Sequence, residues 1–597
     1  MRGENAAGGM LVVLLGLALG SALEWSPAPT ADVSRGSEEA FAEGLHEREM
    51  IPGHGPLRWT RPRSIFRFEA LPAGEAILSL NLVGHRSPVD VLANGVRVVR
   101  LDPNRSGGEF RLPALSRGDL TVELASDGFR AGGDRTLGTQ LRRLTVRPVG
   151  TPPMRVSRAS WLLALCGLGV FVAALSSGIP WPGAVVVAAS AQGLFLALLW
   201  PNGLVRSPYA VALAWLSGWG AVLAAGFALA QRGRGRATMQ WAFIAALVTW
   251  WTLGIAATSP VMIVSDVVFH ANKLAAVAAG DFFPTSVTQH ESVFRIPYAP
   301  ALYALLSPFA KLGWDRVLLV RWGAASAGIA ASAFLFWQLV PRGPAFAGCS
   351  VILLQCAPGW FLVYSYGNLS NAFAQALTVS FFAWAACRGA WLVGATLLTL
   401  ACIGHLSAAI VLGVLVPLLI WRGRSVWRER THALAIVAGL GLSAAYYLAF
   451  APLILEQIPR LLEGGGQGHD PTRGLVGVLW LQILSAARQW GLPAAMLAAL
   501  GVVSWRGDAK LPDSLGPDLR AFWWAGAVLG IAAIASPLEV RYLYALTLPL
   551  AVSGAGALVF LWERGRIGRG VAVVLALSQL AIGLAGIYEA VFLRYRP

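Results

Sequence analysis

Three residues that could carry acid–base or anion-binding chemistry lie close together after an apolar run. Asp266, His270 and Lys273 are spaced at i, i+4 and i+7, so on a helix they would share one face. The apolar run 240–258 ends only a few residues before Asp266, and an ionised carboxylate is costly to keep where water is scarce. The spacing therefore predicts a face that could hold an anion, a divalent cation or an acceptor hydroxyl.

Other candidates follow in the same segment. Asp281 comes directly after Gly280, where a turn-capping carboxylate is the ordinary alternative to a substrate-binding one. His290 and Glu291 are adjacent and could face an acceptor or a metal ion, or else belong to a solvated loop. Arg295 adds a cation for substrate binding. No dense ligand cluster demands a metal ion, so the sequence allows a divalent cation as cofactor but requires none.

Polar residues at the ends of later apolar runs complete the candidate set. His405 lies between two apolar runs and could line the same site, although a lone histidine there is as often a packing residue. Glu539 and Arg541 open a late apolar run. The guanidinium of Arg541 suits a phosphate, because its planar fork donates two parallel hydrogen bonds. The alternative is that Arg541 pairs with Glu539 or extends to lipid head groups.

The composition places these residues in a membrane protein. Of 597 residues, 56% are hydrophobic and 13% are charged, and the mean hydropathy is +0.60, whereas soluble proteins carry about 25% charged residues. The apolar residues come in blocks of about 18–22, the length that crosses a hydrocarbon core. A purely soluble enzyme, a disordered chain and a fibrous repeat are therefore excluded. Five cysteines in or beside apolar runs imply no disulfide framework.

The apolar blocks predict a polytopic α-helical membrane protein with about 13–15 transmembrane helices. The N-terminal run 9–23 is interpreted as a retained anchor in preference to a cleaved signal peptide. The other spans are placed near 160–177, 183–200, 209–230, 240–258, 317–340, 345–357, 371–387, 390–403, 406–421, 432–453, 489–504, 520–536, 541–560 and 571–590.

The arginine-rich connections between these runs predict the orientation. They fall on one side if the spans alternate, and that side is the cytoplasm. Residues 30–150 and the loop 259–298 then lie outside. The net charge of +16 belongs to this orientation pattern and predicts no nucleic-acid partner. Only three basic residues are lysines, a composition typical of a GC-rich bacterial genome.

The long polar stretch 30–152 predicts an extracytoplasmic β-sandwich. Short alternating segments such as 64–68 and 120–124 are typical of strands, and the dipeptide Asn94-Gly95 predicts a β-hairpin. The pattern resembles the jelly-roll carbohydrate-binding modules of extracytoplasmic proteins, with a structural cap that binds no ligand as the alternative. The predicted order is an anchor or signal segment (1–29), the sandwich (30–152), additional transmembrane helices (153–239) and a helical core (240–597).

Three motifs in one order connect the candidate residues with a known family. They are Asp-x3-His-x3-Leu at 266–274, Gly-Asp-x-x-Pro at 280–284 and Pro-Tyr-x-Pro-x-Leu-Tyr at 297–303. Their order resembles the first large external loop of the GT-C superfamily of integral-membrane glycosyltransferases, of the mannosyltransferase and aminoarabinose-transferase type. The resemblance covers roughly residues 240–560. It departs at the front, where several apolar runs and the polar stretch precede the loop.

The resemblance implies an enzyme that takes a sugar from a polyprenyl-phosphate donor. Asp266 matches the carboxylate that serves as base on the first external loop of the family. Arg541 is similar to a late cationic position that contacts the lipid phosphate, with His405 and Lys273 as weaker candidates. The implied transfer inverts the anomeric centre. Its acceptor would be a cell-envelope glycan or lipid, reached from outside the bacterial inner membrane among membrane lipids.

Two other functions stay open on the sequence alone. A lipid-linked-sugar transporter or flippase would share the apolar spans and buried charges, but the internal repeats typical of transporters are not evident. A non-catalytic glycan-binding or assembly protein would use the β-sandwich as its working part. A transfer assay with the purified protein and a lipid-linked sugar separates the three functions.

Overall fold

The computed structural model describes most of the chain, which divides into two compact units. One unit comprises Met1–Leu229, Thr258–Met262 and Tyr588–Pro597, and the other comprises Ala230–Ala257 and Ile263–Ile587. The described residues are 2–22, 30–33, 42–51, 55–68, 71, 74–103, 105–115, 119–130, 136–149, 158–199, 206–258, 267–287, 295–365, 368–385, 389–423, 425–453, 455–456, 490–504, 516–535 and 547–588.

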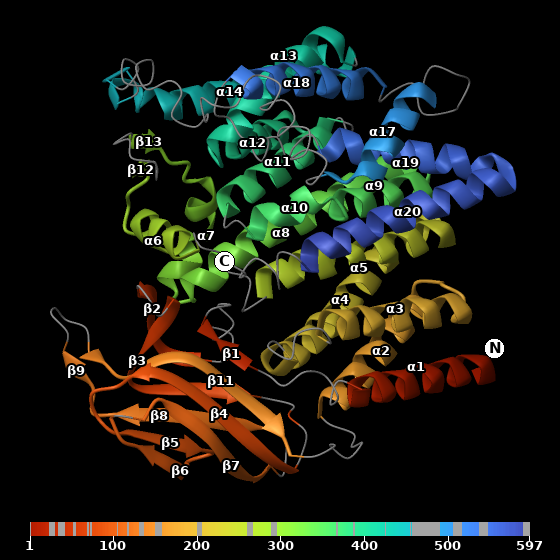
Figure 1. The fold of residues 1–597 in the computed structure, drawn as a ribbon. Helices are drawn as coiled ribbons and strands as arrows, with labels where there is room; N and C mark the ends of the chain where they lie inside the picture. The colour runs from red at the N-terminus through yellow and green to blue at the C-terminus, as the bar shows by residue number, and fades with distance from the viewer. Residues whose placement is uncertain are drawn as a thin grey trace. The chain divides into compact units, whose positions relative to one another are not determined.

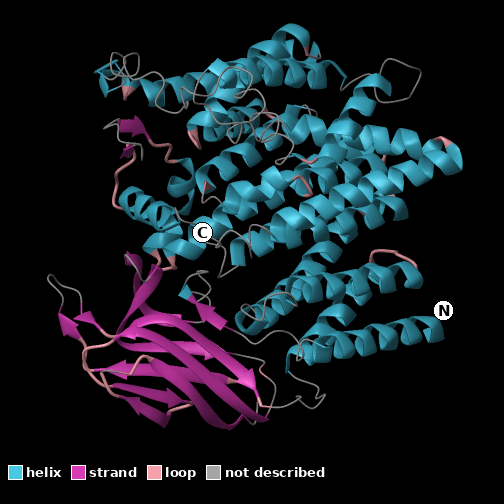
Figure 2. Ribbon diagram, in the orientation of Figure 1, coloured by secondary structure: helices cyan, strands magenta, loops and turns pink. Residues whose placement is uncertain are grey.

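The first unit contains an antiparallel sheet of nine strands (Figure 2). Its path runs β6-β5-β8-β3-β11-β4-β7, with β1 paired to β11 and β2 paired to β3. Two short strands, β9 (Phe129–Arg130) and β10 (Thr136–Leu137), pair separately. The nine strands are β1 (Thr30–Asp32), β2 (Ala42–Ile51), β3 (Gly55–Phe68), β4 (Gly74–Gly84), β5 (Val89–Ala93), β6 (Val96–Leu101), β7 (Gly107–Leu115), β8 (Leu120–Ser126) and β11 (Gln140–Pro148).

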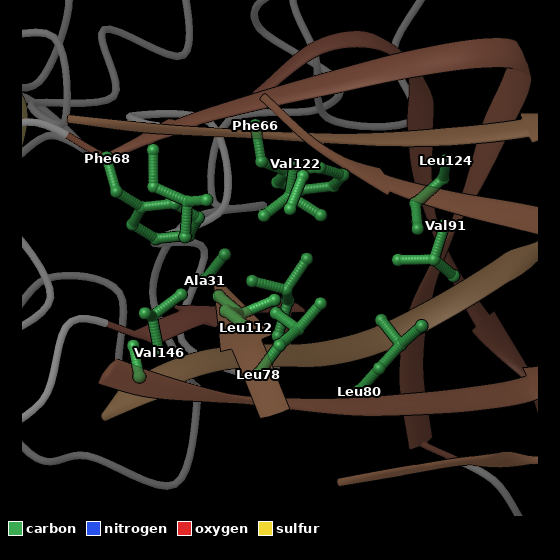
Figure 3. Close-up of a cluster of buried hydrophobic side chains, with 14 of the residues drawn as sticks. Ala31, Phe66, Phe68, Leu78, Leu80, Val91, Leu112, Val122, Leu124 and Val146 are labelled. Carbon is green, nitrogen blue, oxygen red and sulfur yellow. The ribbon is translucent and has the colours of Figure 1, made fainter. Parts of the chain in front are cut away.

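The sheet folds over its own core. Strand β11 pairs with β3 only through Gln140 and Leu141, and then continues along β4. The halves on either side of this corner share one buried cluster (Figure 3), in which Phe66 and Val122 face Leu78. The end strands β6 and β7 approach each other, so the sheet is nearly closed. The predicted antiparallel β-domain is confirmed, but its strands form one connected sheet where a sandwich has two separate ones.

The β5–β6 hairpin forms at the predicted dipeptide. Asn94 and Gly95 have φ angles of 48° and 79°, and a two-residue type I′ turn requires positive φ at both central positions. The side chain of Asn94 accepts a hydrogen bond from the backbone N–H of Thr121 at 2.8 Å. The turn is therefore tied to β8 as well as to its own strands.

Helices α1 (Arg2–Ala22), α2 (Arg158–Ser176) and α3 (Trp181–Leu199) pack together in the first unit, before α4 (Arg206–Ala230). Glycines allow the close approach of α1 to α2. A Cβ at Gly16 would lie 2.6 Å from the Cα of Ala164, and one at Gly20 would lie 2.3 Å from the Cα of Ser160. This Gly-x3-Gly spacing is a recurring means of close helix packing in membranes.

Gln192 of α3 joins the same three helices by hydrogen bonds. Its side-chain amide donates to the backbone carbonyl of Val12 at 3.1 Å and to that of Leu163 at 3.2 Å. Buried amide groups need such partners, because an unpaired polar group in an apolar environment is costly. Helix α1 thus packs as part of this three-helix group, and the retention of the N-terminal run stays a prediction.

The second unit is mainly helical (Figure 1). Helix α8 packs against α6, α9 and α11, α12 packs against α14, and α19 packs against α9 and α17. A short hairpin of β12 (Thr285–Val287) and β13 (Arg295–Pro297) follows α6. The helices are α5 (Arg236–Thr258), α6 (Val267–Ala278), α7 (Ala301–Lys311), α8 (Arg316–Leu339), α9 (Pro344–Gln355), α10 (Pro358–Ser365), α11 (Leu369–Ala385), α12 (Trp391–Cys402), α13 (Leu406–Arg422), α14 (Arg430–Leu448), α17 (Leu492–Ser504), α18 (Gly516–Ala535), α19 (Thr547–Glu563) and α20 (Gly565–Tyr588), with 3₁₀ turns η4 (Arg232–Arg234), η5 (Val340–Arg342) and η6 (Ser425–Arg428).

Length and composition support a membrane protein. In the described part of the chain, five helices are long and apolar enough to cross a membrane. Each of the other predicted spans coincides with a helix, and several of these, such as α9, α12 and α13, are shorter apolar helices. The predicted total of about 13–15 crossings and the direction of each crossing stay predictions. The five helices that are long and apolar enough to cross a membrane are Gly3–Ser21, Arg236–Thr258, Arg316–Arg342, Arg430–Leu448 and Gly565–Ile587.

Candidate functional site

Helix α6 carries two of the predicted site residues. It begins one residue after Asp266, which itself lies outside the described residues. His270 is buried, with 1% of its surface exposed, and Lys273 is half-buried. Both pack on the same ring, because His270 and Lys273 lie 6.4 Å and 5.8 Å from the ring centroid of Tyr298. The predicted common face of His270 and Lys273 is therefore present in this helix.

The end of α6 explains the position of Asp281. Gly280 has a φ of 106°, and the N–H groups of Gly280 and Asp281 donate to the carbonyls of Val277 and Ala276, which is the Schellman arrangement of a helix C-terminus. The exposed carboxylate of Asp281 accepts from the N–H of Phe283 at 3.3 Å. Asp281 thus has the turn-capping contact that the sequence left as its alternative role.

A group of hydroxyls, of which those of Tyr303 and Ser370 are buried and that of Tyr298 is half-buried, surrounds His270. Nδ1 of His270 lies 2.5 Å from the hydroxyl of Tyr303, and the Tyr298 hydroxyl lies 3.3 Å from Oγ of Ser370. The rings of Tyr298 and Tyr303 stack at 6.2 Å. His270, Tyr298, Tyr303 and Ser370 are called the tyrosine cluster below. Burial, more than any neighbour, raises the pKa of Tyr303 well above its ordinary value, so this phenol keeps its proton at neutral pH.

Lys273 places a cation beside the tyrosine cluster. Its ammonium donates to the carbonyl of Thr285 at 2.6 Å and lies 5.3 Å from the ring centroid of Phe269. Burial lowers the pKa of Lys273, and the charge of Asp281 partly opposes that shift. An ammonium has three donors, so the bond to Thr285 does not exhaust its capacity to hold an anion.

Hydrogen bonds bring the starts of three helices to this site. The N–H of Ala301, at the start of α7, donates to the carbonyl of Ile403 at 3.2 Å. Ser407, in the first turn of α13, donates from Oγ to Oδ1 of Asn371, in the first turn of α11, at 2.8 Å. His405 caps α13, since its Nδ1 accepts from the N–H of Ser407 at 3.2 Å. Helix N-termini carry partial positive charge, which favours anions nearby.

The end of α14 closes the same site with aromatic rings. The hydroxyl of Tyr446 donates to the backbone carbonyl of Tyr298 at 3.2 Å. Phe283, which is 54% exposed, stacks on Tyr446 with ring centroids 5.6 Å apart. Residues from the loop after α5 thus contact the starts of α7 and α11 and the end of α14, and α13 joins through the bond of Ser407 to Asn371.

The structure brings together some of the predicted site residues and leaves others undescribed. His270, Lys273 and Asp281 lie in the contact network just given, and His405 joins it through Ser407. Arg295 lies in β13, opposite Val287, and its side chain is not described. The remaining predicted site residues lie outside the described ranges, and their roles stay predictions; they are Asp266, His290, Glu291, Glu539 and Arg541.

Several residues of the site received no role from the sequence. Tyr298 and Tyr303 stand in the motif at 297–303, but nothing in the motif indicates that they contact His270. Ser370 contacts Tyr298 from a different helix. Apart from these site residues, Arg321 is a buried cation of α8, 9% exposed, that donates to the carbonyl of Ala256 at the end of α5 at 3.0 Å. A cation inside a predicted span is a functional signal by itself, and that signal could have found Arg321.

A second buried cluster lies at the other end of the same helices. Trp384 near the end of α11 and Trp427 in η6 flank His432 near the start of α14, with ring centroids 4.7 Å and 6.0 Å away. Nε1 of Trp427 donates to Oδ1 of the buried Asp518 at 2.9 Å. These four residues are called the tryptophan cluster. Ser370 and Trp384 are 14 positions apart in α11, or about 21 Å along a helix axis.

Comparison with known proteins assigns no family to the chain. No family model matches it, and no curated protein matches it. Among the residues that the structure describes, no three histidine, cysteine or acidic side chains gather to hold a metal ion. The chemistry of the site therefore has to be argued from its own residues.

Proposed function

We propose that the protein is an integral-membrane glycosyltransferase of the GT-C type. It transfers a sugar from a polyprenyl-phosphate donor to a cell-envelope glycan or lipid acceptor. The reaction takes place on the extracytoplasmic side of a bacterial inner membrane, with the β-domain on the same side. Asp266 is the base, and Arg541 contacts the donor phosphate together with weaker candidates Lys273 and His405.

The observation that carries this proposal is the gathering of the motif residues at one end of the helical unit. Each of the three motifs places at least one residue in the same network, through His270, Asp281 and Tyr303. The three helix starts and Lys273 supply positive potential for a phosphate, and the imidazoles of His270 and His405 add hydrogen-bonding groups. A transporter would need its polar groups along a pathway through the unit, whereas these groups lie at helix ends.

The proposed reaction is a single displacement at the anomeric carbon. The carboxylate of Asp266 takes the proton of the acceptor hydroxyl, whose oxygen forms the new glycosidic bond. The bond between the anomeric carbon and the phosphate oxygen breaks, and polyprenyl phosphate leaves with the electron pair. Cationic donors stabilise the charge on the leaving phosphate. One displacement inverts one centre, so the product has the opposite anomeric configuration to the donor.

A transfer assay tests the proposal. The purified full-length protein in lipid nanodiscs is incubated with polyprenyl-phosphate sugars and extracted envelope lipids and glycans. The proposal expects release of polyprenyl phosphate in equal amount to glycosylated acceptor. Movement of intact donor across a bilayer without cleavage would identify a flippase. Binding to glycan through the isolated β-domain, with neither cleavage nor movement of donor, would identify a non-catalytic assembly protein.

A further inference from the structure

The tyrosine cluster contains a chain of hydroxyl groups that ends on His270. Tyr303 lies at its centre, because its hydroxyl is 2.5 Å from Nδ1 of His270 and also hydrogen-bonds with the hydroxyls of Tyr298 and Ser370. Tyr303 and Ser370 are 0% exposed and His270 is 1% exposed. Bulk water therefore does not compete for these hydrogen bonds, and the relative donor and acceptor strengths of the protein groups determine which group donates in each bond.

The donors and acceptors of this chain differ in strength. A phenol is more acidic than an aliphatic hydroxyl, and an unprotonated imidazole nitrogen is a stronger acceptor than either hydroxyl oxygen. In the strongest pairing, the hydroxyl of Tyr303 therefore donates its proton in a hydrogen bond to Nδ1 of His270. The oxygen of Tyr303 then accepts from Ser370, whose Oγ can in turn accept from Tyr298, so the hydroxyl donors and acceptors all point one way along the chain.

We propose that Tyr303 is a positioning residue that fixes His270 in the neutral tautomer with its proton on Nε2. Which ring nitrogen carries the proton is set by the hydrogen bond that the other nitrogen makes. With Nδ1 held as an acceptor, Nε2–H is a permanent donor in the first turn of α6, four positions after Asp266 in the sequence. Such a donor suits an anionic oxygen, whether of a phosphate or of a carboxylate.

The role of this tautomer in transfer rests on the proposed function. A histidine whose Nε2 already carries a proton cannot take one there from the acceptor. His270 is thereby assigned to orientation and charge stabilisation, and the base is left to a carboxylate. The tautomer itself is a property of the folded protein and can be measured whether or not the protein transfers sugar.

Nitrogen NMR of the full-length protein tests the tautomer directly. The protein is labelled with ¹⁵N-histidine, and the His270→Gln variant identifies the His270 signals among those of the eight histidines. The expected spectrum of His270 has a protonated Nε2 and an unprotonated Nδ1. A protonated Nδ1, alone or together with a protonated Nε2, would overturn the proposal.

Two tyrosine variants show whether Tyr303 causes the tautomer. Tyr303→Phe keeps the ring stack but removes the phenolic proton, so the two His270 signals should move toward each other as both tautomers become populated. Tyr447→Phe is the matched control, since it removes a half-buried hydroxyl that donates to the carbonyl of Cys402 at 2.9 Å. It should leave the His270 signals unchanged. Unchanged signals in Tyr303→Phe would contradict the proposal.

A transfer measurement on the same samples tests the tautomer of His270 and the proposed glycosyltransferase function separately. Tyr303→Phe should lower kcat by roughly 3- to 10-fold, the usual effect of one hydrogen bond, with little change in the donor KM. If the wild-type protein shows the expected tautomer but transfers no sugar, the proposed function fails and the tautomer assignment stands. If it transfers sugar with a protonated Nδ1, the assignment fails and the proposed function stands.

Discussion

The tyrosine cluster and the tryptophan cluster lie at opposite ends of the same helices and differ in the kinds of side chain that surround their histidines. Both contain a buried histidine among aromatic rings. In the tryptophan cluster, two large rings flank His432, and the indole N–H of Trp427 donates to Asp518. In the tyrosine cluster the side chains are hydroxyls and an imidazole that hydrogen-bond one another.

The difference between the two clusters predicts which end of the helices the proposed transfer uses. Tryptophan has one hydrogen-bond donor and a large apolar surface, so its burial stabilises the packing at a helix end. Tyrosine and serine hydroxyls donate and accept, so a group of them can orient a reacting residue. The tyrosine cluster also lies next to the segment that holds Asp266 and the motifs. The two clusters together predict a stability role for one end of the unit and a catalytic role for the other.

We expect the largest effect in thiol labelling, which should differ completely between positions on the two sides of the membrane. Ser286 lies in β12, near the tyrosine cluster, and Ser425 lies in η6, beside the tryptophan cluster. In a cysteine-free background, a membrane-impermeant thiol reagent added to intact spheroplasts should label Ser286→Cys and leave Ser425→Cys unlabelled. Labelling of position 425 from outside, with position 286 protected, would invert the topology and remove the argument for an external site.

Removal of a ring from the tryptophan cluster should cost the most stability. Trp384 is 1% exposed, so Trp384→Ala should lower the free energy of unfolding by about 3–5 kcal/mol. The matched control is Trp391→Ala in α12, whose side chain is 43% exposed. Thermal unfolding in one detergent compares the two variants. Equal losses would show that the tryptophan cluster is no special point of stability.

The buried carboxylate of the tryptophan cluster should give a smaller loss. Asp518→Ala leaves the indole N–H of Trp427 without the acceptor that it has at 2.9 Å, which should cost about 1–3 kcal/mol. The exposed Asp281 supplies a control, and Asp281→Ala should change the melting temperature far less. A melting curve of Asp518→Ala that overlays the wild type would show that the Trp427–Asp518 bond contributes nothing net.

A variant of Ser407 tests the role of the helix end that carries the tyrosine cluster. Ser407→Ala removes the donor to Asn371 and should lower stability by only about 0.5–1.5 kcal/mol. Because Asn371 lies next to Ser370 of the tyrosine cluster, the fractional loss of sugar transfer should exceed the loss of folded protein at the assay temperature. Transfer rates normalised to the folded fraction check this. A normalised rate equal to that of the wild type would separate Ser407 and His405 from the reaction.

The elements of the fold could be predicted from the sequence because local patterns determine them. Apolar runs of helical length place most helices of the second unit, although α7 and α10 lie outside the predicted spans. Asn94-Gly95 predicts its turn because few residues adopt positive φ. The strands β1 and β2 were not predicted. The 42–51 segment, for example, is rich in charged residues and shows no clear alternation. The single connected sheet depends on the two-residue pairing of β11 with β3, which no local pattern encodes.

The candidate site could be predicted only in part. The spacing of His270 and Lys273 indicated a shared face because helix geometry is regular. The contacts of His270 with Tyr303, and of Tyr298 with Ser370, join residues 33 and 72 positions apart, so they depend on how α6, α7 and α11 pack. Asp281 shows the converse, since its local Gly-Asp signal was compatible with both substrate binding and a turn, and its described contact is the turn.

The most direct test of the central claim is the transfer rate of Asp266→Asn. The substitution keeps the size of the side chain but removes its charge and basicity, so turnover should fall by about 10²–10⁴-fold with donor binding nearly unchanged. Asp518→Asn, at the tryptophan cluster, provides the control and should transfer sugar at close to the wild-type rate per folded molecule. Near-normal transfer by Asp266→Asn would contradict the account and remove Asp266 as the base.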